Sequence, residues 1–383
     1  MKQDAGFWAG KRVLVTGHTG FKGAWLAAWL LADGAQLMGL SLAPEAGPSL
    51  YEQTGLRHRM DETIGDMRDP AVPAQLVDRF RPDVVFHLAA QSLVRRSYRD
   101  PLGTWNTNVM GSANLLAAVS ALDHPCAVVF VTTDKVYENL EWVHPYREND
   151  RLGGKDPYAA SKAANELLVS SWRTSFLGGG GVRVATARAG NVIGGGDWAE
   201  DRIIPDLVRA RQSNHPLSNH PLSNHPLSNH PLSNHPLANH PLANHPLQIR
   251  NPHATRPWQH VLEPLSGYRL LAQRLYLEDD LALQSAFNFG PDSSGQRSVL
   301  ALLTAAEAHW PGGWEDVGAR GQPHEASLLA LTIDKARHVL GWSPRWGFET
   351  AVAHTMQWYR AAFQGADCAR LVADQIAQYE AAA

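Results

Sequence analysis

The fold of this 383-residue chain is decided by the stretch RVLVTGHTGFKG, residues 12–23. Its first part, Arg12–Thr16, is a β-branched and apolar run that predicts a buried strand. Three evenly spaced glycines follow, and Trp25–Ala32 then has the pattern of a helix. A strand, a glycine turn and a helix in immediate succession predict the first unit of an α/β fold that binds a dinucleotide at the turn.

The turn contains the residues that we expect to contact such a cofactor: Gly17, His18, Thr19, Gly20, Phe21, Lys22 and Gly23. Gly17 permits a tight turn, Gly20 lets the backbone approach a pyrophosphate, and Gly23 allows the helix to pack close to the strand. The start of the helix then presents free N–H groups to the phosphates. A purely structural glycine turn is the alternative interpretation.

Strand and helix signals continue to alternate through the first half of the chain. Apolar runs predict further strands, buried on both faces of a parallel sheet, at Gln36–Leu40, Asp83–Leu88, Ala127–Thr132 and Val182–Ala187. Helices are predicted for Gly103–Leu122 and Tyr158–Trp172, each after an Asp-Pro pair that suits an N-cap and a first helical residue. This order predicts an α/β fold built on a doubly wound parallel sheet of the Rossmann type.

The second half is richer in Trp, Pro and Arg, and its strand signals are scattered. We expect a smaller, mixed α/β lobe there that binds the substrate, with Phe287–Gly290 returning a strand to the main sheet. The predicted division is a dinucleotide-binding domain at 1–190 that returns around 257–290, a substrate lobe at 191–256 and 291–362, and a C-terminal helical tail at 363–383.

Residues 213–247 are seven tandem copies of (Ser/Ala)-Asn-His-Pro-Leu inserted in the substrate lobe. A proline in every copy removes a backbone donor each time, which argues against a regular helix or an inner strand. We expect an extended surface loop. The regularly spaced histidines leave a metal-binding or partner-binding arm as the alternative.

Composition excludes several classes of protein. The hydrophobic fraction is 44%, which is typical of a globular chain, and the net charge of -3 predicts no affinity for nucleic acid. We expect no membrane association, because no stretch is long and apolar enough to span a bilayer. The two cysteines, Cys126 and Cys368, form no CxxC pair or metal cluster, so we expect a cytoplasmic protein without a metal site.

The end of the second predicted strand bears on the choice of cofactor. Gly39-Leu40-Ser41 offers neither a carboxylate for an adenosine ribose nor an arginine for a 2′-phosphate, so NAD is only preferred over NADP. Asp66 and Met67 are candidates for contacting the adenine. A polar turn is the alternative interpretation of that segment.

Two groups of residues predict catalysis. Tyr158 and Lys162 share one face at the start of a helix, where a lysine ammonium is expected to lower the tyrosine pKa and prepare it to take a proton from an alcohol. Thr133, Asp134 and Lys135 follow a buried strand, at the edge of the sheet where such folds bind ligands. A capped turn with a surface salt bridge is the alternative for this second group.

The glycine loop, Tyr158-x-x-x-Lys162 and the strand-end Thr133 together resemble the extended short-chain dehydrogenase/reductase family, over nearly the whole chain. The segments from His87 to Gln91 and from Asn106 to Gly111 match that family as well. The resemblance implies NAD as cofactor, with further contacts from Leu88, Ala89, Ala90 and Asn108. It implies sugar-nucleotide contacts from Gln91 and Ser92.

Within the family, the residues after the threonine separate the reactions. Sugar-nucleotide 4-epimerases carry small residues where Asp134 and Lys135 stand, and dTDP-glucose 4,6-dehydratases have Thr-Asp-Glu. Thr-Asp-Lys here, together with the segments from Ala187 to Trp198 and from Ala254 to Val261, is similar to dehydratases that act on CDP-glucose. The implied reaction is loss of water with internal hydride transfer from C4 to C6. The short connector of the family is replaced here by the repeat.

In that scheme Tyr158 takes the C4 hydroxyl proton, Thr133 binds the C4 oxygen, Lys135 takes the C5 proton and Asp134 protonates the leaving C6 hydroxyl. An alternative has Asp134 acting through a water while Lys135 stabilises the enolate. Candidates for the nucleotide diphosphate or the sugar are Asn191, Arg202, Arg256 and Trp258.

Two other functions stay open from sequence. A UDP-N-acetylglucosamine 4,6-dehydratase can also carry Thr-Asp-Lys, and a dinucleotide-sensing regulator would lack turnover. The family resemblance implies a homodimer that pairs through the helices near Gly103–Leu122 and Tyr158–Trp172, with a tetramer as the alternative.

Overall fold

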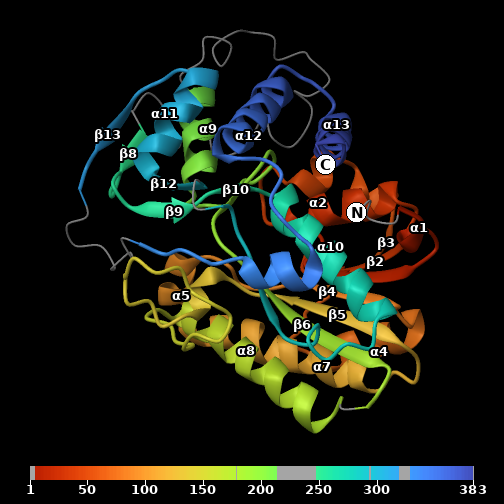
Figure 1. Cartoon of the computed structure of the whole chain (residues 1–383). Helices are drawn as coiled ribbons and strands as arrows, with labels where there is room; N and C mark the ends of the chain where they lie inside the picture. The colour runs from red at the N-terminus through yellow and green to blue at the C-terminus, as the bar shows by residue number, and fades with distance from the viewer. Residues whose placement is uncertain (1–4, 178, 214–246, 293–294, 319–327, 383) are drawn as a thin grey trace.

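The computed structural model describes residues 5–177, 179–213, 247–292, 295–318 and 328–382. Within these residues, the largest sheet has seven strands in the order β3-β2-β1-β4-β5-β6-β11, and every pairing in it is parallel (Figure 1). Their bounds are β1 Arg12–Thr16, β2 Gln36–Ser41, β3 Asp61–Ile64, β4 Val84–His87, β5 Cys126–Val131, β6 Val182–Ala189 and β11 Ala286–Phe289. The predicted doubly wound parallel sheet is confirmed, as is the late strand that returns to it.

The sheet is buried on both faces, as its apolar runs predict. Val13 and Val15 of β1 lie in one hydrophobic cluster with α2 (Phe21–Ala32) and α10 (Leu262–Leu277). Leu14, between them, faces the opposite cluster with α4 (Ala71–Phe80), α7 (Gly111–Ser120) and α8 (Pro157–Ser175). Successive side chains of a strand point to opposite faces, so each strand contributes to two cores.

Both predicted Asp-Pro starts are confirmed. Asp100 caps α6 (Pro101–Trp105) by accepting from the Gly103 N–H, and Asp156 caps α8 by accepting from the Ala159 N–H. The helix predicted over Gly103–Leu122 is confirmed, and a π-helical turn at Asn106–Met110 is inserted in it between α6 and α7 without a break in the helical backbone. Such turns often occur at functional sites.

The sequence patterns missed β3 and α4. The strand Asp61–Ile64 has no buried residue and lies at the edge of the sheet, so it lacks the apolar run that marks the inner strands. The remaining short elements of this half are α1 Ala5–Trp8, α3 Leu50–Gln53, α5 Val94–Arg99 and 3₁₀ turns at Leu56–His58 and Asp134–Val136.

A second group of elements lies beyond the carboxyl ends of the strands (Figure 1). Its small sheets pair β7 (Val192–Ile193) with β10 (Gln259–His260), β9 (Thr255–Pro257) with β12 (Gln296–Ser298), and β8 (Leu247–Ile249) with β13 (Trp314–Asp316). Its helices are α9 Ile203–Ser213, α11 Val299–His309 and α12 Phe348–Phe363. A π-helical turn at Ala336–Leu340 packs instead against α10 and β11. The predicted domain boundaries stay a prediction, and all of the repeat between Ser213 and Leu247 lies outside the described residues.

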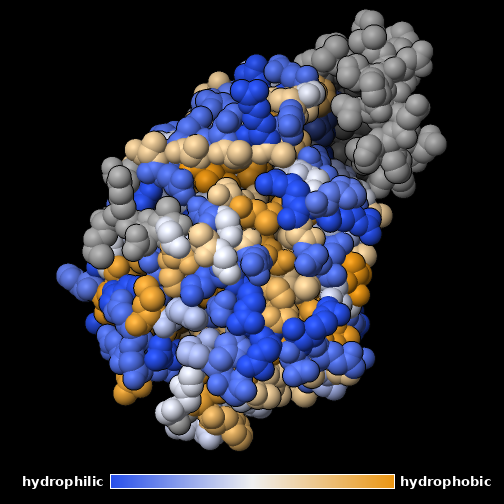
Figure 2. All heavy atoms as spheres, turned by 90° about the vertical axis from the view of Figure 1, so that its right-hand side faces the viewer, coloured by the Kyte–Doolittle hydropathy of each residue, from blue (hydrophilic) through white to orange (hydrophobic). Residues whose placement is uncertain are grey.

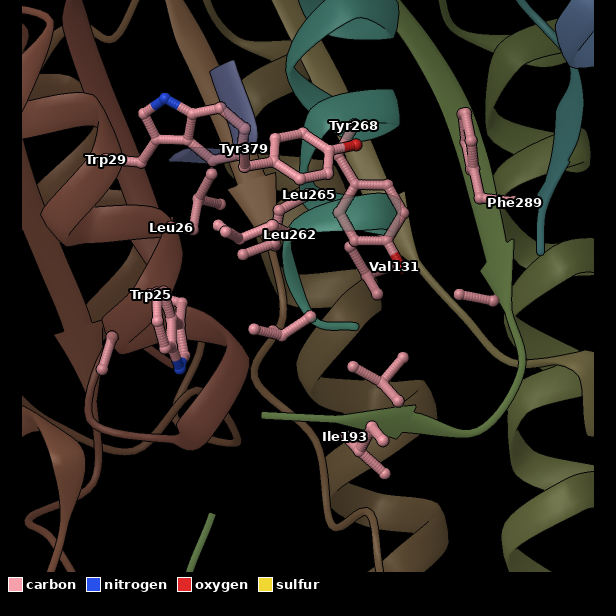
Figure 3. Packing of buried hydrophobic residues seen from close by; sticks show 14 of the residues in the cluster. Trp25, Leu26, Trp29, Val131, Ile193, Leu262, Leu265, Tyr268, Phe289 and Tyr379 are labelled. Carbon is pink, nitrogen blue, oxygen red and sulfur yellow. The ribbon is translucent and has the colours of Figure 1, made fainter. Parts of the chain in front are cut away.

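The C-terminal helix α13 (Cys368–Ala381) packs onto the dinucleotide-binding half. Figure 3 shows Tyr379 between Trp29 of α2 and Leu265 of α10. Its hydroxyl donates to Glu263 at 2.8 Å and lies 2.9 Å from the Ser266 hydroxyl. The last helix therefore closes the core over one face of the sheet.

The face of the molecule over β2, β3 and α4 mixes hydrophilic and hydrophobic side chains (Figure 2). Among the described residues, no helix combines the length and the apolarity that crossing a bilayer requires.

The glycine turn gives a test of the fold. A Cβ at Gly23 would lie 2.1 Å from the Gly17 carbonyl oxygen, whereas a Cβ at Gly20 would lie 3.3 Å from the same atom. We expect Gly23→Ala to destabilise the protein by about 2 kcal/mol, because backbone must move to admit the methyl group. Gly20→Ala, the matched control, should cost clearly less in thermal unfolding. Equal losses of stability in the two variants would show that the close packing of α2 does not require glycine at position 23.

Candidate active site

The sequence-predicted site residues meet at one edge of the sheet. The glycine loop follows β1, Leu88–Ala90 follow β4, Thr132–Lys135 follow β5, and Gly190 and Asn191 follow β6. Because these strands are parallel, their carboxyl ends lie side by side, and segments far apart in sequence share one site.

The glycine loop has the geometry that a pyrophosphate needs. Gly17 has a φ of 78°, and a Cβ there would lie 2.7 Å from the Ala89 nitrogen. Gly20 is the N-cap of α2 and brings no side chain to the N–H groups of the first turn. Uncapped N–H groups at a helix start bind anions, so these residues fit a dinucleotide phosphate.

His18 of the glycine loop is hydrogen-bonded to a residue of the sheet. Its Nε2 lies 2.8 Å from Oε2 of Glu62, which also accepts from the Tyr51 hydroxyl at 2.5 Å. A Cβ at Gly39 would lie 2.5 Å from the His18 ring, so that glycine leaves room for it. Burial lowers the pKa of His18, against the hydrogen bond to Glu62. No carboxylate stands at the end of β2 in the sequence, yet Glu62 of β3 lies beside Gly39 in the register of the sheet.

Asp66 and Met67, predicted near an adenine, are both engaged within the protein. Arg68 donates to the Asp66 carboxylate at 2.6 Å and lowers the pKa of Asp66. Met67 is buried in the cluster beneath α4 and α7. Their contact with a cofactor stays a prediction.

The segment after β4 is fixed by Asn108 of the π-helical turn. The Asn108 amide accepts from the Gln91 N–H at 2.8 Å and donates to the Gln91 carbonyl at 3.0 Å and to Ser161 at 2.9 Å. The Gln91 side chain donates to Thr104 and to the Leu93 carbonyl, while Ser92 is exposed. Asn108 therefore fixes the backbone at Gln91, while Thr16 of β1 holds the N–H groups of Leu88 and Ala89.

The five predicted catalytic residues gather in one cluster. Thr133 donates to Oδ1 of Asp134 at 3.0 Å and accepts from the Lys135 N–H at 3.4 Å. Tyr158 and Lys162 lie in the first turns of α8, and Lys162 donates to the Val131 carbonyl at 3.1 Å. The Thr133 hydroxyl also acts on the Tyr158 phenol, whose pKa it lowers.

The prediction that Lys162 lowers the pKa of Tyr158 is wrong. Burial raises the pKa of Tyr158 to about 12, opposed by the Thr133 hydrogen bond and by the charge of Arg202. Lys162 points at the Val131 carbonyl, and burial lowers the pKa of its own ammonium to about 8. Burial thus outweighs the favourable charges near the phenol.

Asp134 has the properties of a general acid. Burial raises the pKa of its carboxyl, although Lys135, Thr133, Arg256 and Lys22 oppose the rise. Its Oδ2 finds no hydrogen-bond partner among the described residues. A Cβ at Gly190 would lie only 3.0 Å from that oxygen, so glycine there keeps a methyl group away from it. A buried carboxyl that favours its protonated form can donate a proton.

Lys22 of the glycine loop also belongs to this cluster. Burial and the charge of Arg202 lower the pKa of Lys22 to about 7, against the Asp134 carboxylate. Its ammonium lies 5.9 Å from the centre of the Tyr268 ring. Figure 3 shows the Tyr268 side chain pointing from α10 toward Val131, and its buried hydroxyl finds no partner among the described residues. No sequence pattern distinguishes Tyr268, because it occupies what looks like an ordinary apolar position of a helix.

The residues predicted to bind the substrate differ in their surroundings. The charge of Arg256 acts on Asp134 and that of Arg202 on Tyr158, so both cations lie near the catalytic cluster. The Asn191 carbonyl accepts from the Gln259 N–H at 3.1 Å. Trp258 is buried in the core and donates to the Arg297 carbonyl at 3.0 Å, which is a packing role. Among the described residues, no three metal-ligating side chains come together.

Comparison with known proteins defines the class. A family model described as GDP-mannose 4,6 dehydratase matches residues 14–192. The fold is similar to an epimerase from Methanothermobacter thermautotrophicus, with a TM-score of 0.74 and 21% identity over 95% of this chain and 96% of that one. It is also similar to a dTDP-glucose 4,6-dehydratase from Bacillus anthracis in complex with NAD, with a TM-score of 0.70 and 19% identity over 92% and 98% of the chains.

A relative that is similar in sequence over its full length identifies the family within this fold class. The CDP-glucose 4,6-dehydratase of Salmonella typhimurium is 42% identical over 99% of this chain and 99% of its own length. The chain therefore belongs to the CDP-glucose 4,6-dehydratase family of extended short-chain dehydrogenases/reductases.

The raised pKa of Asp134 predicts a stability effect. The unfolded chain ionises this carboxyl at its ordinary pKa, whereas the folded state resists ionisation, so the folded state is penalised as pH rises. We expect Asp134→Asn to raise stability by about 1 kcal/mol at neutral pH while activity is lost. The gain should vanish below about pH 4, where both states are protonated.

Thermal unfolding across this pH range measures the effect. Asp83→Asn is the control of opposite sign, because Arg12 holds the pKa of Asp83 low despite burial. That variant should lose stability at neutral pH. A lower stability of the Asp134→Asn variant at neutral pH would contradict a raised pKa for the Asp134 carboxyl in the folded protein.

Proposed function

We propose that this chain is a hydro-lyase that converts CDP-glucose to CDP-4-dehydro-6-deoxy-glucose. The observation that carries the proposal is the buried Asp134, next to Thr133 and Tyr158: its pKa is raised, and its Oδ2 has no hydrogen-bond partner among the described residues. An epimerase has no departing hydroxyl and needs no such acid. The similarity to the Salmonella enzyme supports CDP-glucose as the substrate.

When bound at this site, NAD would supply the hydride transfer from C4 to C6 of the sugar. The residues that would hold it are those of the glycine loop, Gly17 to Gly23, with Leu88, Ala89 and Ala90 after β4. Asn108 supports that segment, and Lys162 would reach the nicotinamide ribose. Asp66 and Met67 stay candidates for the adenine. The dehydratase from Bacillus anthracis, which has this fold, was solved with NAD.

The oxidation half uses Tyr158 and Thr133. Tyr158 removes the proton of the C4 hydroxyl, and Thr133 donates a hydrogen bond to the same oxygen. The raised pKa of Tyr158 must fall for this step, and Arg202 already acts in that direction. A bound, oxidised nicotinamide would add a positive charge that also lowers this pKa.

The elimination half uses Asp134 and Lys135. The C4 ketone acidifies the C5–H bond, Lys135 takes that proton, and Asp134 donates a proton to the C6 hydroxyl as it leaves as water. Burial favours the protonated carboxyl that this step requires. In the alternative scheme, Asp134 acts through a water and Lys135 stabilises the enolate.

Arg202 and Arg256 are the proposed contacts of the nucleotide diphosphate, since guanidinium groups suit phosphate. Asn191, Gln91, Ser92 and Trp258 stay candidates for orienting the substrate, although the Gln91 and Trp258 side chains are already engaged. The free thiols of Cys126 and Cys368 support a reducing, cytoplasmic location.

Deuterium at C4 of CDP-glucose tests the reaction. We expect the label at C6 of the product, without net reduction of the cofactor, because the hydride is returned to the same molecule. Mass spectrometry and NMR of the product measure its position. Release of the label to solvent would contradict internal transfer.

A panel of sugar nucleotides tests the substrate. Turnover of UDP-N-acetylglucosamine but not of CDP-glucose would overturn our choice in favour of that alternative. Tyr158→Phe is the control, and it should keep the fold and lose at least about 100-fold in turnover. A wild-type protein inert toward every sugar nucleotide would favour the regulator instead.

We further propose a homodimer formed through α6, the π-helical turn and α8. Large apolar side chains are exposed there: Leu102 at 82%, Met110 at 53%, Leu167 at 63% and Phe176 at 65%. Exposed apolar side chains that gather on one surface mark contact surfaces. The proposal concerns the dimer, and a tetramer is the alternative.

Light scattering tests this surface. Leu167→Arg should shift the mass from dimer to monomer, because it places a charge in the proposed contact. Leu281→Arg is the matched control, since Leu281 is 80% exposed on the loop after α10. An unchanged mass for Leu167→Arg would place the interface elsewhere.

A further inference from the structure

A buried ion pair lies directly beneath the catalytic cluster. Glu166 stands on α8, one turn after Lys162, and Arg188 stands on β6. Their side chains are each only 4% exposed, and Nη2 of Arg188 lies 2.9 Å from Oε2 of Glu166. The catalytic scheme above uses neither residue.

The Glu166 carboxylate is fully satisfied. Oε1 accepts from the Thr132 hydroxyl at 2.6 Å and from Nε of Arg188 at 3.0 Å. Oε2 accepts from the Thr186 hydroxyl at 2.6 Å and from Nη2 of Arg188 at 2.9 Å. Burial alone would raise the pKa of Glu166, but these partners outweigh it and lower that pKa, so the carboxylate stays charged.

The same pair reaches both ends of the catalytic turn. Thr132 immediately precedes Thr133, and Glu166 holds its side chain. Tyr137 follows Val136 at the other end of the turn, and its hydroxyl accepts from Nη1 of Arg188 at 2.8 Å. The Tyr137 hydroxyl in turn donates to Asn288 of β11 at 2.7 Å. Residues 133–136 are therefore bracketed by one rigid, buried network.

We propose that Glu166 and Arg188 are positioning residues that fix the turn carrying Thr133, Asp134 and Lys135. Glu166 holds the turn where it leaves β5, and Arg188 holds it where it ends. Neither residue touches the substrate. A misplacement of about 1 Å in a catalytic group can cost on the order of 100-fold in rate, so such an anchor matters for turnover.

The competing interpretation is a pair that only stabilises the fold. Thr132 and Thr186 can distinguish the two interpretations. Both are buried and both donate to Glu166 at 2.6 Å, but they lie in different segments. Thr132 leads into the catalytic turn, whereas Thr186 lies inside β6. Replacing either with valine removes one hydrogen bond of the same length from the same carboxylate.

The experiment compares Thr132→Val with Thr186→Val in the full chain with NAD. We expect similar drops in Tm for the two variants, since each loses one equivalent bond. Thr132→Val should lower kcat about 10-fold or more with KM little changed, and it should raise the isotope effect of C4-deuterated CDP-glucose. Thr186→Val should stay within about two-fold in kcat, and Thr132→Ser, which keeps the hydroxyl, should restore it.

Equal kcat values for the two valine variants would overturn the proposal, as would an effect on KM alone. The kinetic arm rests on the proposed dehydratase function, so a second arm uses no substrate. Amide hydrogen exchange at residues 133–137 should accelerate in Thr132→Val and not in Thr186→Val. Unchanged exchange in both variants would refute the anchor even if the substrate assignment failed for other reasons.

Discussion

The parallel pairing of the seven strands is the constraint on which the site depends. It brings the ends of β1, β4, β5 and β6 to one edge. The proposed catalytic groups lie there: Thr133, Asp134 and Lys135 follow β5, and Tyr158 and Lys162 lie in the first turns of α8. Helices cover both faces of this sheet, so the strands that lead into the site are packed between two hydrophobic cores. A loop carrying Asp134 could not keep an unpartnered buried oxygen in place without that support.

The sequence predicted the features that are local in the chain. The glycine spacing, the Asp-Pro caps and the apolar runs fix elements within a few residues of themselves, and the structure confirms them. The π-helical turn and β3 were missed because neither leaves a distinctive pattern: the turn inserts into a helical sequence, and β3 is a short polar edge strand. Boundaries of this kind are decided by tertiary packing.

The candidate site was predictable in its residues but not in its electrostatics. Tyr158 and Lys162 were found from their spacing, yet whether the ammonium faces the phenol depends on the Val131 carbonyl, which is distant in sequence. Glu62 and Tyr268 reach the site from β3 and α10, and neither belongs to a recognisable sequence motif. Glu166 did leave a signal, since it lies one helical turn beyond Lys162 on the same face.

Two buried carboxylates in this lobe show how environment assigns roles to one functional group. Glu166 receives four hydrogen bonds, two of them from Arg188, and its pKa is lowered. Asp134 receives one from Thr133, keeps one oxygen without a partner in the described structure, and its pKa is raised. Glu166, with all its hydrogen bonds made, can anchor neighbouring segments but cannot donate a proton. Asp134, with one oxygen unpartnered, can donate a proton but makes too few bonds to fix the turn that carries it. A fold that needs both functions within a few residues has to use two separate groups, and here the buried pair supplies the support that the acid lacks.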